Sequence, residues 1–194
     1  MLSTYAVPKN LIERQELTAE TGTSATITFA DIPQTYDHLE VVMYARSDRA
    51  ATVDFVDLEF NGDTTADNYD MQRLWGTGST VGAQALATIG QYSGTIPGTS
   101  IGANIFGQST TTVYNYTKTD RHKHRLVVEA NGIDGTSAQR LGLSSARWES
   151  TAAITSIVIT SQNGANFIVG SVFELRGISS TIPVLPAAGY TIFF

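Results

Sequence analysis

The sequence contains no cysteine, few charged residues and no long apolar run. Without cysteine, the 194 residues can form neither disulfides nor thiolate metal sites. Charged residues make up 15% of the chain, which is unusually few for a cytosolic enzyme and suits β-structure coated with hydroxyl side chains. Every apolar run is shorter than the about 20 residues that span a bilayer, so no membrane partner is predicted.

The charge that is present is mostly negative, with a formal net charge of −6. Proteins bind nucleic-acid backbones by neutralising phosphates with cationic side chains, so we exclude nucleic acid as the main partner. Residues 1–8 lack the basic region and apolar core of a signal peptide. The sequence therefore predicts a protein that is made in a cytoplasm and stays there until it is assembled or released.

Helical periodicity is also missing, whereas short segments of alternating apolar and polar residues recur along the chain. Turn dipeptides such as Asn61-Gly62 and Asn163-Gly164 separate several of them. This pattern is typical of an antiparallel β-sandwich, and we predict an all-β fold of jelly-roll type with long loops. Strands are expected at 11–17, 25–29, 38–46, 55–60, 69–75, 87–92, 110–116, 122–130, 141–148, 154–160 and 167–175.

The chain is expected to form one domain with an extended arm at each end. We place the N-terminal arm at residues 1–10, the β-sandwich domain at 11–178 and the C-terminal extended arm at 179–194. Residues 64–107 are rich in glycine and serine, so we expect mainly irregular surface loops there, interrupted by two strands.

Both arms carry apolar or aromatic side chains, which would be a liability in water. The C-terminal arm can fold back onto its own sandwich, or it can dock on a neighbouring subunit, and the sequence favours neither interpretation. For docking, the candidate contact residues are Leu2, Tyr5, Pro183, Pro186, Tyr190, Phe193 and Phe194.

Two histidines could form half of a metal site. His122 and His124 would lie on one side of a strand. Their cationic neighbours Arg121, Lys123 and Arg125 disfavour a divalent ion, and the segment has no carboxylate. We therefore expect an exposed basic strand that pairs with an acidic neighbour.

The segment 54–70 is rich in aspartate and raises the question of calcium. It lacks the central glycine and the final glutamate of a calcium loop, so solvated turns are favoured over a calcium site. We predict no metal and no cofactor.

No arrangement of residues indicates catalysis. The sequence has three histidines and no Gly-x-Ser-x-Gly elbow, the motif that presents a nucleophilic serine. His38 has Asp37 beside it, but neighbouring residues of a strand point to opposite faces. The 18 acidic residues leave a glycosidase pair open, yet no pair stands out. We therefore predict that the protein is not an enzyme.

Aromatic residues offer one further kind of site, because their rings can stack on sugars. Trp148 lies in an alternating segment and is expected in the core. Trp75 lies in the expected loop region beside Gly76 and Gly78, which would let a partner approach closely. Tyr69 and Trp75 are the candidate contacts for a host glycan.

The segment 27–39 reads as a strand, a proline corner and a second strand. Ile27 and Phe29 alternate with threonines, Pro33 ends the pairing, and Leu39 re-enters an apolar layer. The corner has no catalytic chemistry, so it points to an architectural role.

Together with other motifs in a fixed order, this corner resembles a group of small all-β structural proteins of tailed bacteriophages, especially marine and cyanobacterial ones. The resemblance covers 11–178. The chain departs from the group at Arg176, where an aromatic residue is usual, and in its tail at 179–194. The motifs are 27–39, Arg46-Ser47-Asp48, Phe60-Asn61-Gly62-Asp63, Asn68-Tyr69, Trp148 with Ala153-Ile154-Thr155-Ser156-Ile157, and 167–178.

The resemblance implies a virion protein of the head-decoration, head-fibre or tail-fibre type. The leading hypothesis is a capsid decoration protein that binds the major capsid protein or other virion proteins as a homo-oligomer, with a trimer favoured. The alternative is a tail-fibre or receptor-binding module that contacts host surface glycans. Both hypotheses place the protein in the virion.

Overall fold

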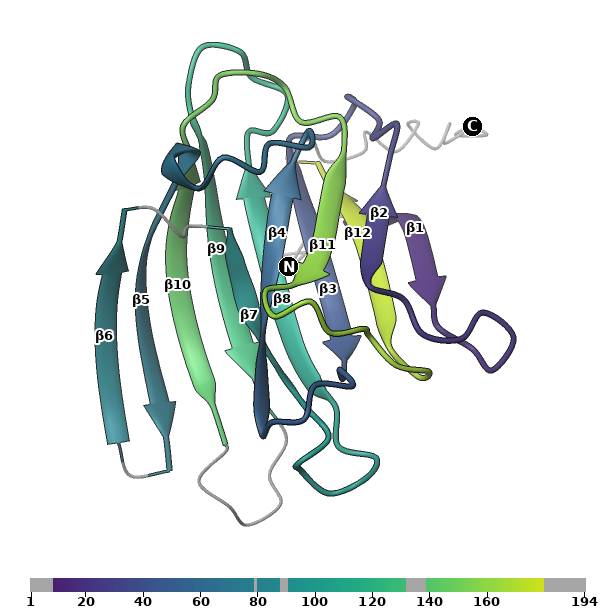
Figure 1. Ribbon diagram of the computed structural model, residues 1–194. Helices are drawn as coiled ribbons and strands as arrows, with labels where there is room; N and C mark the ends of the chain where they lie inside the picture. Colours follow the sequence, from purple (N-terminus) through teal and green to yellow (C-terminus); the bar gives the residue numbers. More distant parts are fainter. Residues whose placement is uncertain (1–8, 79, 88–90, 132–138, 180–194) are drawn as a thin grey trace, which may run out of the picture.

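The computed structural model describes residues 9–78, 80–87, 91–131 and 139–179. This part of the chain contains twelve β-strands and one short 3₁₀ helix, and it has no α-helix (Figure 1). The elements are β1 (Lys9–Glu16), β2 (Thr26–Phe29), β3 (His38–Ala45), β4 (Val53–Phe60), η1 (Ala66–Asn68), β5 (Tyr69–Thr77), β6 (Thr80–Leu86), β7 (Tyr92–Pro97), β8 (Gly107–Tyr114), β9 (Lys123–Ala130), β10 (Leu141–Trp148), β11 (Ile157–Ser161) and β12 (Val172–Ile178).

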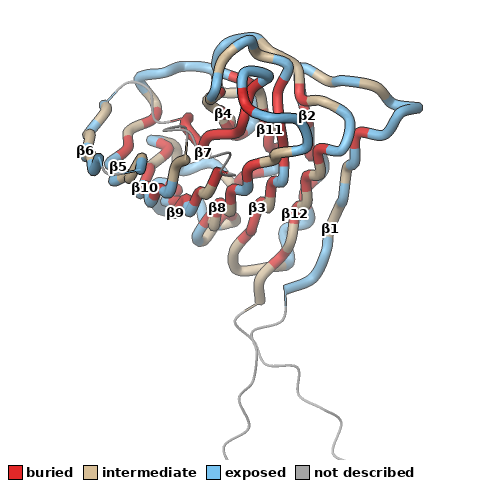
Figure 2. Tube along the Cα trace, turned by 90° about the horizontal axis from the view of Figure 1, so that it is seen from below, coloured by how far each residue is buried: buried red, intermediate tan, exposed pale blue. Residues whose placement is uncertain are grey.

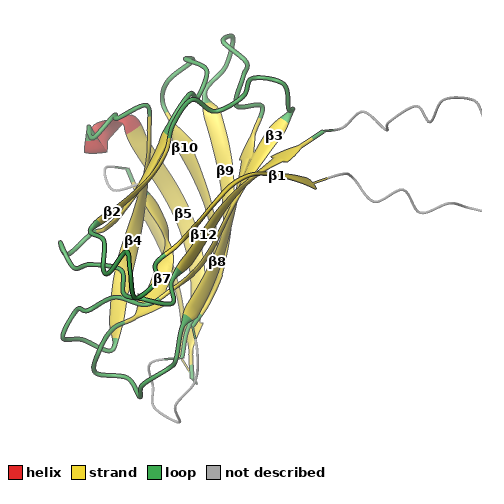
Figure 3. Ribbon diagram, turned by 90° about the vertical axis from the view of Figure 1, so that its right-hand side faces the viewer, coloured by secondary structure: helices red, strands yellow, loops and turns green. Residues whose placement is uncertain are grey.

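The strands form two antiparallel sheets that pack face to face. The larger sheet has eight strands in the order β1-β12-β3-β8-β9-β10-β5-β6, and the smaller has four in the order β2-β11-β4-β7. Seen edge on, the smaller sheet forms a second layer over the curved larger sheet (Figure 3). The chain passes repeatedly between the layers, for example from β2 to β3 and from β3 to β4. The predicted all-β sandwich is confirmed.

Alternation along the strands places one face of each sheet in a shared core. In β4, Val56, Leu58 and Phe60 are fully buried and alternate with partly exposed residues. Trp148 on β10 is 3% exposed, as the alternation predicts, and its ring packs against Phe60. The buried residues gather between the two layers, whereas the edge strands β1 and β6 are more exposed (Figure 2). Inner-face positions therefore hold the sandwich together, and outer-face positions of the larger sheet are free for other roles.

The proline corner packs as the sequence indicates. Leu39 is fully buried after the corner, and Tyr36 packs against the core while partly exposed. The hydroxyl of Tyr116 donates to the carbonyl of Pro33 and accepts from the backbone N–H of Tyr36 at 3.4 Å. Gly177 lies against the Tyr36 ring, where a Cβ would overlap it. The corner, which connects β2 of the smaller sheet to β3 of the larger one, thus also packs against β12.

The strand expected at 69–75 is confirmed by β5, but the prediction of mainly irregular loops over the rest of 64–107 is wrong, because that region also contains β6 and β7. The strand expected at 87–92 falls between two observed strands, because β6 ends at Leu86 and β7 begins at Tyr92. Residues 88–90 lie outside the described part. β7 escaped notice because small and hydroxyl residues supply most of its buried surface, in the sequence Tyr-Ser-Gly-Thr-Ile-Pro. β6 has no regular alternation of large apolar and polar residues.

The prediction of an exposed basic strand at 122–130 is wrong for its inner face. Lys123 and Arg125 lie on the inner face of β9 and are 0% and 2% exposed, whereas His122 and His124 are exposed. Backbone carbonyls solvate the buried ammonium, which makes its burial tolerable. The Nζ of Lys123 donates at 2.5–3.0 Å to the carbonyls of Lys118, Arg121 and Thr151.

Candidate functional site

The two residues predicted to contact glycan, Tyr69 and Trp75, both lie on the inner face of β5. Tyr69 is fully buried, and its ring stacks on Trp148 with centroids 6.4 Å apart. Its hydroxyl donates to the carbonyl of Asp63 at 2.9 Å. Burial raises the pKa of Tyr69 to about 12. The ring has no face to offer a sugar, which removes Tyr69 from the candidate contacts.

Trp75 is partly exposed and belongs to a cluster of arginines and aromatic rings. The guanidinium carbons of Arg73 and Arg140 lie 4.6 Å and 5.4 Å from the centroid of its ring. Gly82 on β6 lies against the same ring, where a Cβ would overlap it. Cation–π attraction holds both cations at the indole. The ring that the sequence offers to a sugar therefore already stacks on the protein's own arginines.

A small cleft of about 160 Å³ opens beside this cluster. The Nη2 of Arg73 donates to the side-chain oxygen of Gln84 at 2.7 Å, and its Nε is buried without a hydrogen-bond partner among the described residues. The cleft is thus positively charged and partly aromatic, a combination that suits an anionic group. It is lined by Phe55, Met71, Arg73, Gln84, Leu86, Tyr92 and Gln162.

Behind the cleft, a buried carboxylate ties β7 to β9. Glu129 accepts hydrogen bonds from the hydroxyl of Tyr92 and, at 2.9 Å, from that of Thr95. The Nε of Arg140 lies 3.7 Å from the same carboxylate. Burial and the negative charge of Glu129 raise the pKa of Tyr92. Donors on several sides compensate the buried charge, so this network reads as structural.

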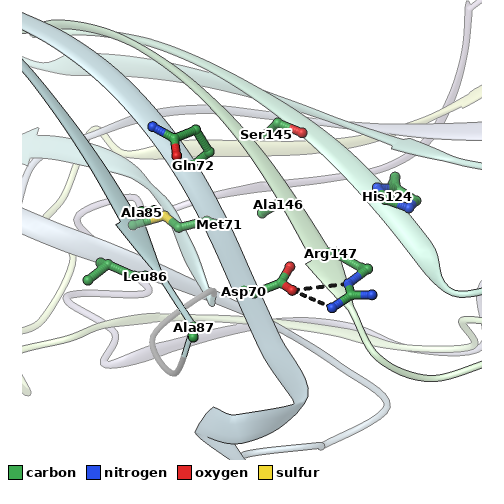
Figure 4. A pocket seen from close by; sticks show the side chains of 10 residues that line it. All are labelled: Asp70, Met71, Gln72, Ala85, Leu86, Ala87, His124, Ser145, Ala146 and Arg147. Carbon is green, nitrogen blue, oxygen red and sulfur yellow. Dashed lines mark hydrogen bonds and ion pairs between the residues drawn. The ribbon is translucent and has the colours of Figure 1, made fainter.

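A shallow groove of about 590 Å³ runs over β5, β9 and β10 (Figure 4). Arg147 lies within it and pairs with both Asp70 and Glu149, each at 2.5 Å. His124 also borders the groove. The charges largely neutralise one another, and exposed pairs of this kind contribute little to stability or binding.

Next to the groove, apolar side chains gather on the outer face of the larger sheet. This outer apolar patch consists of Leu74, Val81, Val128, Leu141 and Leu143, which line a shallow depression of about 340 Å³. Leu143 stands in register between Leu74 and Val128 on its two neighbouring strands. Val81 and Leu141 are the most exposed, at 83% and 65%. The patch is continuous across four strands.

The aspartates of the segment 54–70 point to separate partners rather than to one centre. Asp54 accepts from the hydroxyl of Ser161 at 2.8 Å, and Asp63 accepts from the indole of Trp148 at 2.7 Å. Asp70 pairs with an arginine in the groove. Across 9–78, 80–87, 91–131 and 139–179, no group of three or more acidic or histidine side chains could hold a metal.

Sequence reasoning missed a buried cation between the sheets, Arg125, whose charge also acts on the partly buried Asp57. Arg125 on β9 is enclosed between the sheets, and its Nη1 donates to the carbonyl of Leu58 at 3.1 Å. Desolvation lowers the pKa of Arg125 to about 10. Burial also raises the pKa of Asp57 on β4 to about 6, against the opposing pull of Arg125. Alternation with the buried Val127 was the signal that could have placed Arg125 inward.

The predicted partner contacts cannot be placed on this framework, because all of them lie outside the described residues. They are Leu2, Tyr5, Pro183, Pro186, Tyr190, Phe193 and Phe194. In the described ranges, no helix has the length and apolar character needed to cross a membrane. Neither a family model, nor a curated protein, nor a solved structure matches the sequence.

Proposed function

We propose that this chain is a non-enzymatic structural protein of a tailed-bacteriophage virion, which decorates the capsid shell as a homo-oligomer. The observation that carries the proposal is the outer apolar patch. Monomeric proteins seldom expose contiguous apolar surface unless it serves an interaction. The sandwich core is complete without these side chains, since they face away from the smaller sheet. The patch is therefore available to bind another protein.

The assignment to a virion is supported by the ordered motifs that resemble small phage structural proteins, from the proline corner to 167–178. Several of these motifs have architectural roles in the fold. Asn61 accepts from the backbone N–H of Thr155 at 2.8 Å, and Arg46 donates to the carbonyl of Ile101 at 2.8 Å. Motif residues whose hydrogen bonds fasten the connections to the sandwich suit a building block.

The proposal is tested with purified full-length protein and phage shells that lack it. Leu143→Lys puts a charge at the centre of the patch on a side chain that is 46% exposed, so folding is preserved. We expect the occupancy of shells by this variant to fall by about tenfold or more, measured by co-sedimentation, because the lysine must be desolvated. The matched control is Ser145→Lys, which lies on the same strand and outer face but outside the patch. Equal binding by both variants and wild type would remove the patch from the proposal.

A second candidate function is a receptor-binding module, and the cluster around Trp75 favours it. Two guanidinium groups and an indole beside a small cleft suit a sugar that carries a carboxylate or another anionic group. A glycan array that includes acidic sugars, probed with wild type and Arg73→Gln, tests this function. Binding of acidic glycans that is lost in Arg73→Gln would favour adhesion over decoration, and an absence of binding by wild type would reject adhesion.

A further inference from the structure

The eight-stranded sheet has two edges of very different character. β1, at one edge, carries Lys9, Glu13, Arg14 and Glu16. β6, at the other edge, reads Thr-Val-Gly-Ala-Gln-Ala-Leu and contains neither charge nor proline. Charges and proline are the usual devices that stop an edge strand from pairing with another chain. The edge at β6 therefore lacks the features that prevent pairing with another chain, whereas the edge at β1 has charged residues that oppose it.

The register of the β5–β6 hairpin shows which backbone groups of β6 face away from β5. Thr77 pairs with Thr80 across a two-residue connection in which Gly78 has φ +58°. In such a hairpin the residues that flank the connection form a hydrogen-bonded pair, and such pairs alternate with non-bonded ones. Gly82 and Gln84 therefore bond to β5. The N–H and C=O groups of the intervening residues point to the free edge, namely those of Val81, Ala83 and Ala85.

We infer that β6 pairs with β6 of a second copy of this chain, antiparallel and about a twofold axis at Ala83. In this register Ala83 faces its own counterpart, and Val81 faces Ala85 of the other copy. All outward groups of the three residues are then used, which gives about six intermolecular hydrogen bonds. A shift by two residues in either direction would leave one of the three residues without a partner. The two larger sheets would join into one continuous sheet.

The edge suits a second copy because its three outward-facing residues are arranged symmetrically about Ala83 and so match themselves in an antiparallel pair. Each chain has a net charge of −6, so a contact between two copies is least unfavourable where it adds no close pair of like charges. The side chains of Val81, Ala83 and Ala85 are all exposed, small or apolar, and on the outer face. Pairing in this register creates no clash of like charges. It also makes the two outer apolar patches neighbours on one surface, which would present a doubled docking area to a shell.

This inference rests on the self-association included in the proposed function, but it needs no virion, so each can fail alone. The first test is disulfide capture of the full-length protein in solution. The chain has no cysteine, so Ala83→Cys introduces a unique thiol. Residues facing each other in a bonded pair have Cα atoms about 5.5 Å apart, which suits a disulfide. We expect mild oxidation to give covalent dimers of this variant.

Two matched cysteine variants separate the alternatives. Ser145→Cys lies on the outer face of β10, and Asn10→Cys lies on β1 at the opposite edge, both exposed. Dimers of Ser145→Cys without dimers of Ala83→Cys would show that the faces meet rather than the edges. Mixed dimers of Asn10→Cys with Ala83→Cys would show head-to-tail joining of β1 to β6. Either result overturns the inference.

The second test uses a charge in place of a thiol. Val81→Lys introduces a charge that opposes pairing at the β6 edge. We expect the mass measured by light scattering to fall from that of a dimer to that of a monomer. Leu141→Lys places the same charge on the outer face away from the edge and should leave the dimer intact. A wild-type protein that stays monomeric at every accessible concentration, or a trimer that Val81→Lys does not disturb, contradicts the inference.

Discussion

At the scale of single residues, the least expected feature is charge between the two sheets. Arg125 has one backbone acceptor, and its Nε and Nη2 have no hydrogen-bond partner among the described residues. The Oδ1 of Asp57 is likewise buried without a donor. Attraction between the two side chains offsets only part of the desolvation of each, so the pair is held at a cost. The cost should be visible in the pH dependence of stability.

Replacing Asp57 by asparagine should change that pH dependence. Burial raises the pKa of Asp57 from 3.8 to about 6. The folded protein therefore binds a proton more tightly than the unfolded chain, and its stability falls as pH rises from about 4 to above 6. Asp57→Asn lacks this titration. Its free energy of unfolding relative to wild type should rise by about 1–3 kcal/mol across the window, measured by urea unfolding at several pH values.

The matched control is Glu20→Gln, which neutralises an exposed carboxylate in the turn after β1. It shows the effect of removing one negative charge from the surface. If Asp57→Asn has the same pH dependence as wild type, the Asp57 carboxylate is not desolvated in solution as the structure indicates.

At the scale of strands, the sequence predicts those elements whose inner face is apolar. β4 lies close to its predicted range because its large apolar residues Val56, Leu58 and Phe60 alternate with polar ones. β7 was missed because most of its buried residues are small or carry hydroxyls, and one of these hydroxyls, on Thr95, bonds to the buried carboxylate of Glu129. The outer apolar patch was also missed. Leu141 and Leu143 look like core residues in sequence, and only the phase set by Trp148 turns them outward.

The same limits apply to the candidate site. The glycines beside Trp75 marked it as a candidate contact, but the sequence did not indicate that two arginines stack on its ring. Arg73 comes from the same strand, whereas Arg140 lies 65 positions further along the chain. Only the β5–β10 pairing brings the second arginine to the indole. Contacts that depend on strand order cannot be read from alternation, since alternation gives each strand's faces but not its neighbours.

An element-scale prediction concerns the turn between β4 and β5. Asp63 accepts from the Trp148 indole at 2.7 Å, the Asn68 side chain at 2.7 Å and the Thr65 backbone at 3.0 Å. Asp63→Ala leaves all three donors without this acceptor, so the turn loses its anchor to β10. We expect a loss of about 1–3 kcal/mol in the free energy of unfolding, measured by urea titration.

The matched control, Asp67→Ala, removes an exposed carboxylate from the 3₁₀ helix of the same connection and should lower the free energy of unfolding by less than about 0.5 kcal/mol. Similar losses in both variants would contradict the anchoring role.

At the scale of the whole molecule, the positions where the arms begin are informative. Lys9 pairs with Ile178, so the start of β1 and the end of β12 lie side by side at one edge of the larger sheet (Figure 1). Both arms therefore start from neighbouring points, at the edge opposite β6. One partner surface could receive both. Docking that is repeated in each copy of an oligomer would make weak single contacts effectively permanent.

Deleting residues 183–194 should therefore abolish incorporation into the particle while leaving the sandwich folded. If the arm docks on a neighbour, each ~100 Å² of apolar surface that it buries there is worth about 2.5 kcal/mol before ordering costs, so loss of its aromatic end should remove most of the binding free energy. Occupancy of shells and thermal unfolding of the isolated protein are measured together. The matched control changes Ala187 and Ala188 to serine in the same arm and should retain occupancy. If the deletion instead lowers the unfolding temperature of the isolated protein and leaves occupancy unchanged, the arm folds back on its own sandwich and docking must be assigned to the outer apolar patch alone.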